Sequence, residues 1–442
     1  MRWNNWSQTA SCQPTYFHRP ETKQQILDIL AYARLHEENV RVVGEGRSMS
    51  DIACTDGHMI SLERFCRILN TERESGKVKV ESGITLGILN ERLNEVGLAL
   101  PNLPSVSQLS VAGAISTGSH GTGIAFGILS THVVELELIT SSGTELTCSR
   151  KENSDVFLAA LCSLGALGVI TTVTFQCEHS FYLDAVRFPL PIESVLGDIN
   201  KIVSAAEHVK IWWFPHTDKC IVWQANRARH PPTSTSSTIN LRKKLHEIAD
   251  TVVGYYSVDM SYHLSHYSPR VVPYLNRLYR RLLFNSSRAE FDLSYKVFCL
   301  DNLVQQYIHS CSIPLQNVHK AIHSIKKMIL EKKYTLHFPV QITFVSGDDI
   351  WLSPAYGGDR AFISLVMYKP VGRDTHLKCF TEFEQKMSSL GGRPHWGLFK
   401  EWDLSKCKSI YPKFDDFVKM REKLDPQKLF NNQYLQRIFG DC

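Results

Sequence analysis

A predicted strand runs directly into a glycine turn in the stretch Val-Val-Gly-Glu-Gly-Arg-Ser-Met-Ser, residues 42–50. Glycines let the main chain turn with positive φ and approach a ligand closely. Successive amides in such a turn form a concave nest that suits a pyrophosphate. The turn lacks the Lys-Ser/Thr end of a P-loop and the third glycine of the dinucleotide-binding fingerprint. It therefore indicates a phosphate-bearing cofactor held in another way, although a Gly-x-Gly turn by itself is more often only a turn.

Two further segments rich in small residues follow, at 111–123 and 163–170. The first mixes glycine and alanine with serine, threonine and His120, a composition that we do not expect in a packed helix or strand. Glycines permit close approach to a flat or extended ligand, and hydroxyls and amides reach its oxygen atoms. Any one segment alone could be a loop, but three within one domain favour a shared binding site.

Length and composition limit the class of protein. A chain of 442 residues is long enough for two or three domains. Its 43% hydrophobic and 21% charged content is that of a soluble globular protein. The net charge of +5 is spread along the chain, with no basic run interleaved with aromatics, so no nucleic-acid partner is predicted. The 12 cysteines include no Cys-x-x-Cys pair, which argues against a zinc cluster, and no metal site is predicted.

The pattern of apolar residues predicts two α+β units and a helical tail. In the first, short strands and helices do not alternate as regular βαβ units. Its helices are predicted at 20–36, 84–98 and 155–162, and its strands at 39–43, 58–62, 77–82, 133–140, 145–148 and 168–175. Aromatic and histidine residues become frequent after about 181, and 229–240 is a polar loop. The second unit has a predicted helix at 314–333 and strands at 336–345 and 361–368.

No membrane-spanning segment is predicted, because no run of 18 apolar residues occurs. The N-terminus has no apolar core of the kind that a signal peptide needs. Leucines and arginines alternate within 251–284, which fits a basic helix lying on a membrane. The same pattern fits a surface helix with one buried face, the commoner role for such a helix.

The chain resembles the aldonolactone oxidoreductases, flavoproteins of the vanillyl-alcohol-oxidase type, and most closely the L-gulonolactone oxidase group. The motifs that carry the resemblance lie at 42–48, 51–57, 111–113, 119–123, 213–217, 347–354, 391–396 and 421–426. The resemblance implies an α+β fold with three parts. These are an FAD-binding PCMH-type first domain (1–180), an α+β cap domain (181–375) and a C-terminal segment (376–442) that packs back on the first domain.

The resemblance also implies an activity, in which a sugar 1,4-lactone is oxidised by hydride transfer to flavin N5 and ascorbate is the expected end product. The electrons then pass to oxygen or another acceptor, while the protein positions the substrate and tunes charge near the ring. The implied location is the endoplasmic reticulum membrane, with peripheral membrane contact; cytoplasmic and mitochondrial locations are the alternatives.

The family motifs mark candidate site residues. Those expected to bind FAD are Val43, Gly44, Glu45, Gly46, Arg47, Ser48, Ser105, Val106, Gly113, Ser116, Thr117, Gly118, His120, Gly121, Thr122, Gly168, Val169, Ile170 and His395. Those expected to take part in catalysis are His395, Gln341 and Arg393, and those on the substrate side are Trp213, Gln341, Thr343 and Trp396. An unperturbed histidine pKa near 6.5 would allow His395 an acid/base role.

Arg47 departs from the family pattern, since many members carry at this position a histidine that is bound covalently to FAD. A guanidinium stays charged and is not nucleophilic at neutral pH, so it cannot be expected to form that bond. The sequence therefore predicts non-covalent FAD, with Arg47 pairing with a phosphate oxygen instead.

Two further departures lie near the expected active site. The family strand carries Glu and Arg where this chain has Gln341 and Thr343, which share one face of a strand. Gln cannot accept a proton and Thr carries no charge. Loss of one preorganised electrostatic group costs ~10²–10³ in rate. Many relatives also have Lys where this chain has Leu398, with Lys400 two residues on.

Three functions remain open on the sequence alone. The leading one is FAD-dependent oxidation of an L-gulonolactone-type lactone. The second is an oxidoreductase on the same scaffold with a changed substrate, and the third is a FAD-binding protein whose catalysis is impaired. The intact glycine segments favour retention of FAD, whereas the changes at Gln341 and Thr343 favour the second and third functions.

Overall fold

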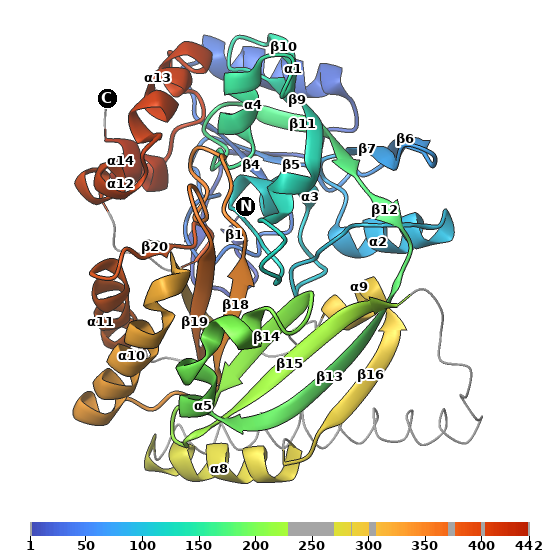
Figure 1. Ribbon diagram of the computed structural model, residues 1–442. Helices are drawn as coiled ribbons and strands as arrows, with labels where there is room; N and C mark the ends of the chain where they lie inside the picture. Colours follow the sequence, from blue (N-terminus) through green and yellow to red (C-terminus); the bar gives the residue numbers. More distant parts are fainter. Residues whose placement is uncertain are drawn as a thin grey trace.

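The computed structural model describes residues 2–228, 269–283, 285–299, 306–369, 376–398 and 403–440. These residues form two β-rich parts, one above the other in Figure 1, with helices along their outer sides. The upper part contains the first domain and the lower part contains the cap domain. The last helices of the chain, drawn in red, lie beside the first domain.

A small parallel sheet in the first domain leads into the glycine turn. Its strand order is β3-β5-β4, and the turn follows β4. Ile26, Leu30 and Ala33 of helix α1 recur at helical spacing and are fully buried against this sheet. Thr22 and Gln25 form a capping box at the start of α1, which fixes where the helix begins. The bounds are β1 Trp3–Asn4, β2 Ser11–Cys12, β3 Tyr16–His18, α1 Lys23–Leu35, β4 Val40–Val43 and β5 His58–Ser61.

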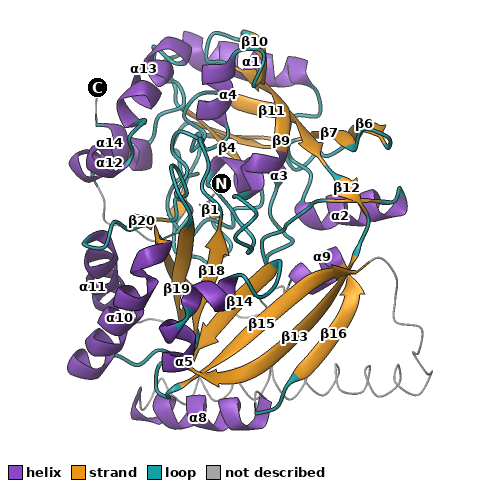
Figure 2. Cartoon of the chain, in the orientation of Figure 1, coloured by secondary structure: helices purple, strands orange, loops and turns teal. Residues whose placement is uncertain are grey.

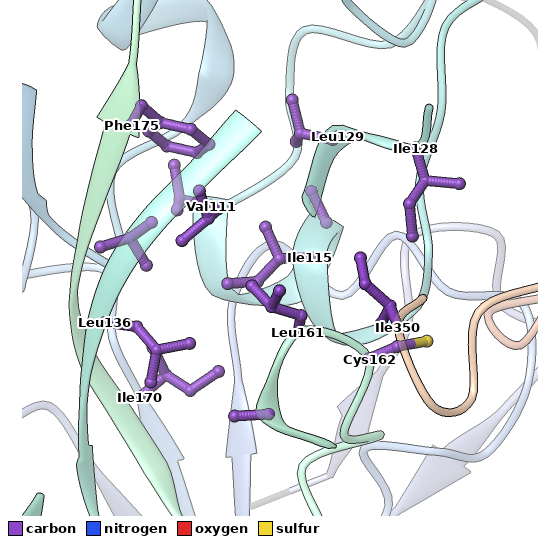
Figure 3. Close-up of a cluster of buried hydrophobic side chains, with 14 of the residues drawn as sticks. Val111, Ile115, Ile128, Leu129, Leu136, Leu161, Cys162, Ile170, Phe175 and Ile350 are labelled. Atoms are coloured by element: carbon purple, nitrogen blue, oxygen red, sulfur yellow. The ribbon is translucent and has the colours of Figure 1, made fainter. Parts of the chain in front are cut away.

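A five-stranded antiparallel sheet, ordered β10-β9-β11-β7-β6, completes the first domain. Val111 and Ile115 of the short helix α3 pack against Leu136 of β9 and against Ile170 and Phe175 of β11 (Figure 3). The bounds are β6 Ile68–Glu72, β7 Lys77–Glu81, α2 Leu86–Glu95, β8 Leu98–Ala99, α3 Val111–Ser116, η1 Leu129–His132, β9 Val133–Ile139, β10 Glu145–Ser149, α4 Ser154–Ala160, β11 Val169–Gln176 and β12 Glu178–His179.

The cap domain is built on one eight-stranded antiparallel sheet, ordered β16-β13-β15-β14-β18-β19-β17-β20. Helices α10 and α11 lie on one side of it (Figure 2), where they bury a separate apolar core. The end of β18 meets the first domain through an isolated bridge between Gly123 and Val345. The strands are β13 Tyr182–Pro191, β14 His208–Trp213, β15 Lys219–Ala228, β16 Arg288–Leu293, β17 Gln306–Pro314, β18 Val340–Val345, β19 Arg360–Tyr368 and β20 Arg393–Pro394.

Helices in this half of the chain divide between the two domains. Helix α11 and strand β20 belong to the cap domain, so the return to the first domain begins after them and later than the predicted boundary at 376. Helices α12, α13 and α14 then pack with the core of the first domain. The bounds are α5 Ile192–Gly197, α6 Ile199–Val203, η2 Pro269–Val271, α8 Val272–Leu283, α9 Ser294–Phe298, η3 Leu315–Asn317, α10 Val318–Lys332, α11 Leu377–Ser388, α12 Leu404–Ile410, α13 Phe414–Leu424 and α14 Gln433–Phe439.

One prediction about local structure is wrong. The small-residue segment 111–123 was not expected to be helical, yet its first six residues form α3. Ser110 caps this helix by accepting a hydrogen bond from the amide of Gly113, and small side chains allow it to pack closely. The rest of the segment is a loop, in which Gly118 has a φ of +70°.

The basic stretch 251–284 is described only from residue 269 onward. Helix α8 buries Val272 and Asn276, whereas Tyr274 is 67% exposed and Leu278 is 49% exposed. The helix thus packs by one face, as a surface helix does. In the part of the chain that the structure describes, no helix is long and apolar enough to cross a bilayer. The predicted loop 229–240 lies outside the described residues.

Candidate functional site

The three small-residue segments meet at one pocket in the first domain. The pocket encloses about 920 Å³, including the open space at its mouth, and lies between the turn after β4, helix α3 and the loop before β11. The predicted residues that line it are Val43, Gly44, Glu45, Gly46, Arg47, Ser48, Gly113, Ser116, Thr117, Gly168 and Ile170.

Unpartnered polar groups mark the part of this pocket formed by the glycine turn. The amides of Gly44, Glu45, Gly46 and Ser48 donate no hydrogen bond to any other described residue. The hydroxyl of Ser50, which also lines the pocket, is buried without a partner among the described residues. A buried hydroxyl is normally satisfied, so Ser50 fits a polar ligand, and the amides of the half-buried or exposed turn are available to an anionic group such as a pyrophosphate.

Arg47 lines the same pocket, and its guanidinium lies 4.5 Å from the centre of the Trp6 ring. A cation over an indole face is held there by the ring quadrupole. In the described part of the chain, no histidine is among the residues that line the pocket.

Arg41 is a structural residue of the pocket that the sequence did not reveal. Its guanidinium is buried and donates to the carbonyls of Ile52, Leu164, Gly165 and Phe430, at 2.6–3.1 Å. Two loops that line the pocket are thereby tied to the C-terminal segment. The position of Arg41 within a predicted strand of valines could have indicated a buried arginine, but the sequence does not specify which carbonyls accept its hydrogen bonds.

A polar face of the cap sheet forms the second part of the site. Strand registers place Trp212, Gln341, Ser364 and Ser310 in one row across β14, β18, β19 and β17. The neighbouring row on the same face contains Trp223, Lys210, Thr343, Phe362 and Ser312. Side chains two residues apart on a strand share a face, so Gln341 and Thr343 lie together as predicted from their spacing.

His120 and His395 lie over this face. The His120 ring stacks on Phe362 with centroids 3.7 Å apart, and the two histidine rings are 6.1 Å apart. The amide of His395 donates to the carbonyl of Ser310. Since Ser119 lines the cofactor pocket and His120 follows it, the pocket ends beside the polar face.

Both histidines are held neutral. Burial lowers the pKa of His120 to about 4, and the positive charge of Lys210 also lowers it. Burial and the neighbouring His120 lower the pKa of His395 to about 3. Nδ1 of His120 donates to the Gly121 carbonyl, whereas Nδ1 of His395 accepts from the Gly397 amide. Neutral His120 therefore has its free lone pair on Nε2, while neutral His395 has its N–H there.

Three residues predicted at the active site are packed elsewhere. Trp213 points into the cap core, on the opposite face of β14 from Trp212, because successive strand residues alternate. Trp396 is fully buried, donates to the Leu352 carbonyl and stacks on Tyr411. Arg393 donates to two backbone carbonyls and lies over Tyr411. For these three the predicted substrate-side or catalytic roles are corrected to structural ones.

The other predicted residues lie around the pocket rather than on its lining. Ser105 accepts a hydrogen bond from Lys210, and Thr122 donates to the Val209 carbonyl between the two domains. Val169 is in the core, while Gly118, Gly121 and the half-buried Val106 flank the lining residues. Leu398 is half-buried beside His395, and Lys400 lies outside the described residues.

Lys210 is the charged group of the site that sequence reasoning missed. It is 5% exposed, and its ammonium donates to Ser105 Oγ at 3.2 Å and lies 5.0 Å from the Trp223 ring centre. The alternation of residues 208–213 could have placed it on the face of Trp212, because the two are two positions apart.

Comparisons with known proteins give full-length matches. The profile of the D-arabinono-1,4-lactone oxidase family matches residues 173–438, and that of an FAD-binding domain matches residues 14–149. The chain is 36% identical to the L-gulonolactone oxidase of Bos taurus, with 99% of this chain and 98% of that protein covered. It is 32% identical to the L-gulono-1,4-lactone dehydrogenase of Mycobacterium tuberculosis, with 99% of both covered. Its structure matches cholesterol oxidase from B. sterolicum with a TM-score of 0.81 at 17% identity, covering 99% and 96% of the two chains.

Proposed function

The chain belongs to the aldonolactone oxidase family, and on that basis we propose that it oxidises a sugar 1,4-lactone of the L-gulonolactone type. The observation that supports this substrate class is the polar face of the cap sheet beside the cofactor pocket. Trp212, Gln341 and Ser364 form one row there, and Gln341 is exposed. Amide and hydroxyl groups on a sheet face can bond several hydroxyls of one sugar.

The coarser assignment does not depend on the substrate. The protein is an FAD-dependent oxidoreductase, and the predicted family, cofactor and vanillyl-alcohol-oxidase type of fold are confirmed. The turn at 44–48 would hold FAD through the amides of Gly44, Glu45, Gly46 and Ser48, which have no partner among the described residues, and the segments around Gly113 and Gly168 line the same pocket. Bound FAD would accept the hydride from the lactone C–H and pass the electrons to oxygen or another acceptor.

The residues of this chain would bind and orient the lactone. Neutral His395 offers an N–H on Nε2, and neutral His120 offers a lone pair on Nε2. A hydroxyl between them would accept from the first and donate to the second. Because the pKa of each ring lies far below 7, we expect these rings to orient the hydroxyl rather than to keep its proton.

Anaerobic addition of L-gulono-1,4-lactone to the purified holoprotein tests this function. We expect the visible flavin absorbance to bleach, because the lactone reduces bound FAD in the absence of oxygen. L-galactono- and D-arabinono-1,4-lactone serve as related substrates, and chemical reduction with dithionite gives the fully reduced control. A flavin spectrum that dithionite bleaches but no aldonolactone changes would contradict the proposal. It would then favour a changed substrate or impaired catalysis, the two alternatives that Gln341 and Thr343 support.

We also propose that FAD is held without a covalent bond, since Arg47 stands in the pocket at the position of the family's flavin-linked histidine. Precipitation of the protein with acid is expected to release all the flavin into the supernatant, measured by its absorbance. The Arg47→His variant is the matched comparison, because it supplies an imidazole that can form the bond. Yellow colour retained on the precipitated original protein would refute the proposal.

Location and electron acceptor remain proposals from the family resemblance, at the endoplasmic reticulum membrane and with oxygen or another acceptor. The outward face of α8 supports peripheral contact with an anionic lipid surface, since Tyr274 and Leu278 are exposed beside Arg277 and Arg281. Failure of the protein to sediment with anionic vesicles would exclude this contact.

A further inference from the structure

The Lys210 ammonium is buried without a balancing charge. Among the described residues it forms no ion pair, and its one hydrogen bond goes to the neutral hydroxyl of Ser105. Contact with the face of Trp223 attracts the cation but does not neutralise it. Buried charges are normally paired, because removal from water is costly. The surroundings of this lysine therefore fit a ligand that brings a negatively charged or strongly polar group close to the ammonium.

The charge is present at neutral pH. Burial lowers the pKa of Lys210 to about 8, while the fields of Cys299 and Glu290 act in the opposite direction. Glu290 is exposed on β16. The charge of Lys210 lowers the pKa values of His120 and His208, in addition to the effect of burial. The lysine thus acts electrostatically on groups of both domains.

The position of Lys210 relative to Thr343 indicates which role this charge has in the site. The two residues are directly paired across β14 and β18. Cβ atoms of such pairs are roughly 4.5–5.5 Å apart, while the ammonium itself contacts Ser105 and the ring of Trp223 on β15, the other neighbour of β14. Residue 343 is where the family resemblance implies an arginine, and this chain has threonine there. A cation is therefore kept on the same face, one strand away.

We propose that Lys210 supplies the positive charge of this site in place of an arginine at 343, and that this charge favours the reduced, negatively charged flavin over the oxidised one. The inference rests on the proposed function in taking the polar face as the active site, but it does not depend on which lactone is the substrate. Preorganised charges that face a group where negative charge develops stabilise it strongly in a site shielded from water.

The test is the two-electron reduction potential of bound FAD in the holoprotein at pH 7, measured by spectroelectrochemical titration. Lys210→Met keeps the length of the stem and removes the charge. We expect reduction to become at least tenfold less favourable, which corresponds to about 30 mV for a two-electron couple. Lys210→Arg is expected to keep the original potential, because it keeps the charge.

Moving the positive charge from residue 210 to residue 343 distinguishes an electrostatic effect on the potential from an effect of altered packing. In the Lys210→Met background, Thr343→Arg is expected to bring the potential back toward that of the original protein. Equal potentials for the original protein and Lys210→Met would overturn the proposal, and so would a lowered potential that Thr343→Arg does not raise. If Lys210→Met does not retain FAD, Lys210→Gln takes its place, because its amide can still bond Ser105. None of these measurements needs a lactone, so an inactive enzyme would count against the proposed function and leave this result intact.

Discussion

Replacement of Arg41 by methionine is expected to lower the free energy of unfolding by at least about 3 kcal/mol. The guanidinium donates to four buried carbonyls, and a buried hydrogen bond to a charged group contributes about 1.5–3 kcal/mol. Burying the guanidinium itself costs free energy, so the net loss is smaller than the sum of the four bonds. Methionine fills much of the same space but leaves the carbonyls without a donor. Urea unfolding of the holoprotein, followed by circular dichroism, measures the change.

The same substitution should weaken FAD binding, because two of the loops that Arg41 holds line the cofactor pocket. Arg92→Met is a matched control, since Arg92 is 61% exposed and pairs with Glu95 on the same helix. Such surface pairs contribute about 0–1 kcal/mol. If Arg41→Met unfolds at the same urea concentration as Arg92→Met, the four bonds do not stabilise the pocket in solution.

Gln341→Glu is expected to increase the rate of FAD reduction by L-gulono-1,4-lactone, by roughly 10². Gln341 is exposed on the polar face, between Trp212 and Ser364 in its row. A carboxylate there can accept a proton from a lactone hydroxyl and carries a negative charge, whereas the glutamine amide can accept only a hydrogen bond through its oxygen. Lys210 lies diagonally across β14 and β18, roughly 7–8 Å away between Cα atoms and within reach of a long side chain. The substitution would thus restore a pair of opposite charges, and stopped-flow absorbance without oxygen measures the rate.

Gln341→Met is the control, because it keeps the shape of glutamine without its polar atoms and should not increase the rate. An unchanged rate in a folded, FAD-loaded Gln341→Glu protein would mean that the missing carboxylate does not limit lactone oxidation. The substrate would then have to be sought among compounds that need no carboxylate at this position.

Local chemistry allowed the cofactor end of the site to be predicted. Gly44 and Gly46 lie in a turn that lines the pocket, and the amides of this turn belong to residues adjacent in sequence. The short motif therefore predicts the turn without any knowledge of distant contacts. The cap side depends on pairing between distant strands. Gln341 meets Trp212 and Ser364 only because β18 lies between β14 and β19, which no local pattern specifies.

Two errors have the same physical origin. The motif at 213–217 drew attention to Trp213, but strand alternation sends Trp212 toward the site and Trp213 into the cap core. Likewise, Arg393 belongs to a family motif, yet its hydrogen bonds go to the backbone of two other segments. A motif predicts which segments lie near the site, whereas the direction of each side chain depends on the strand or loop that carries it.

The C-terminal segment has a consequence for the biosynthesis of the protein. Asn432 donates to the carbonyls of Ile52 and Cys54, next to the glycine turn, and Arg41 bonds the carbonyl of Phe430. The amide of Val40 donates to the carbonyl of Leu429. A growing chain on the ribosome lacks these partners until residues 429–432 have been translated. The first domain is thus synthesised early, but the loops beside its cofactor pocket gain these bonds only after most of the cap domain has been made.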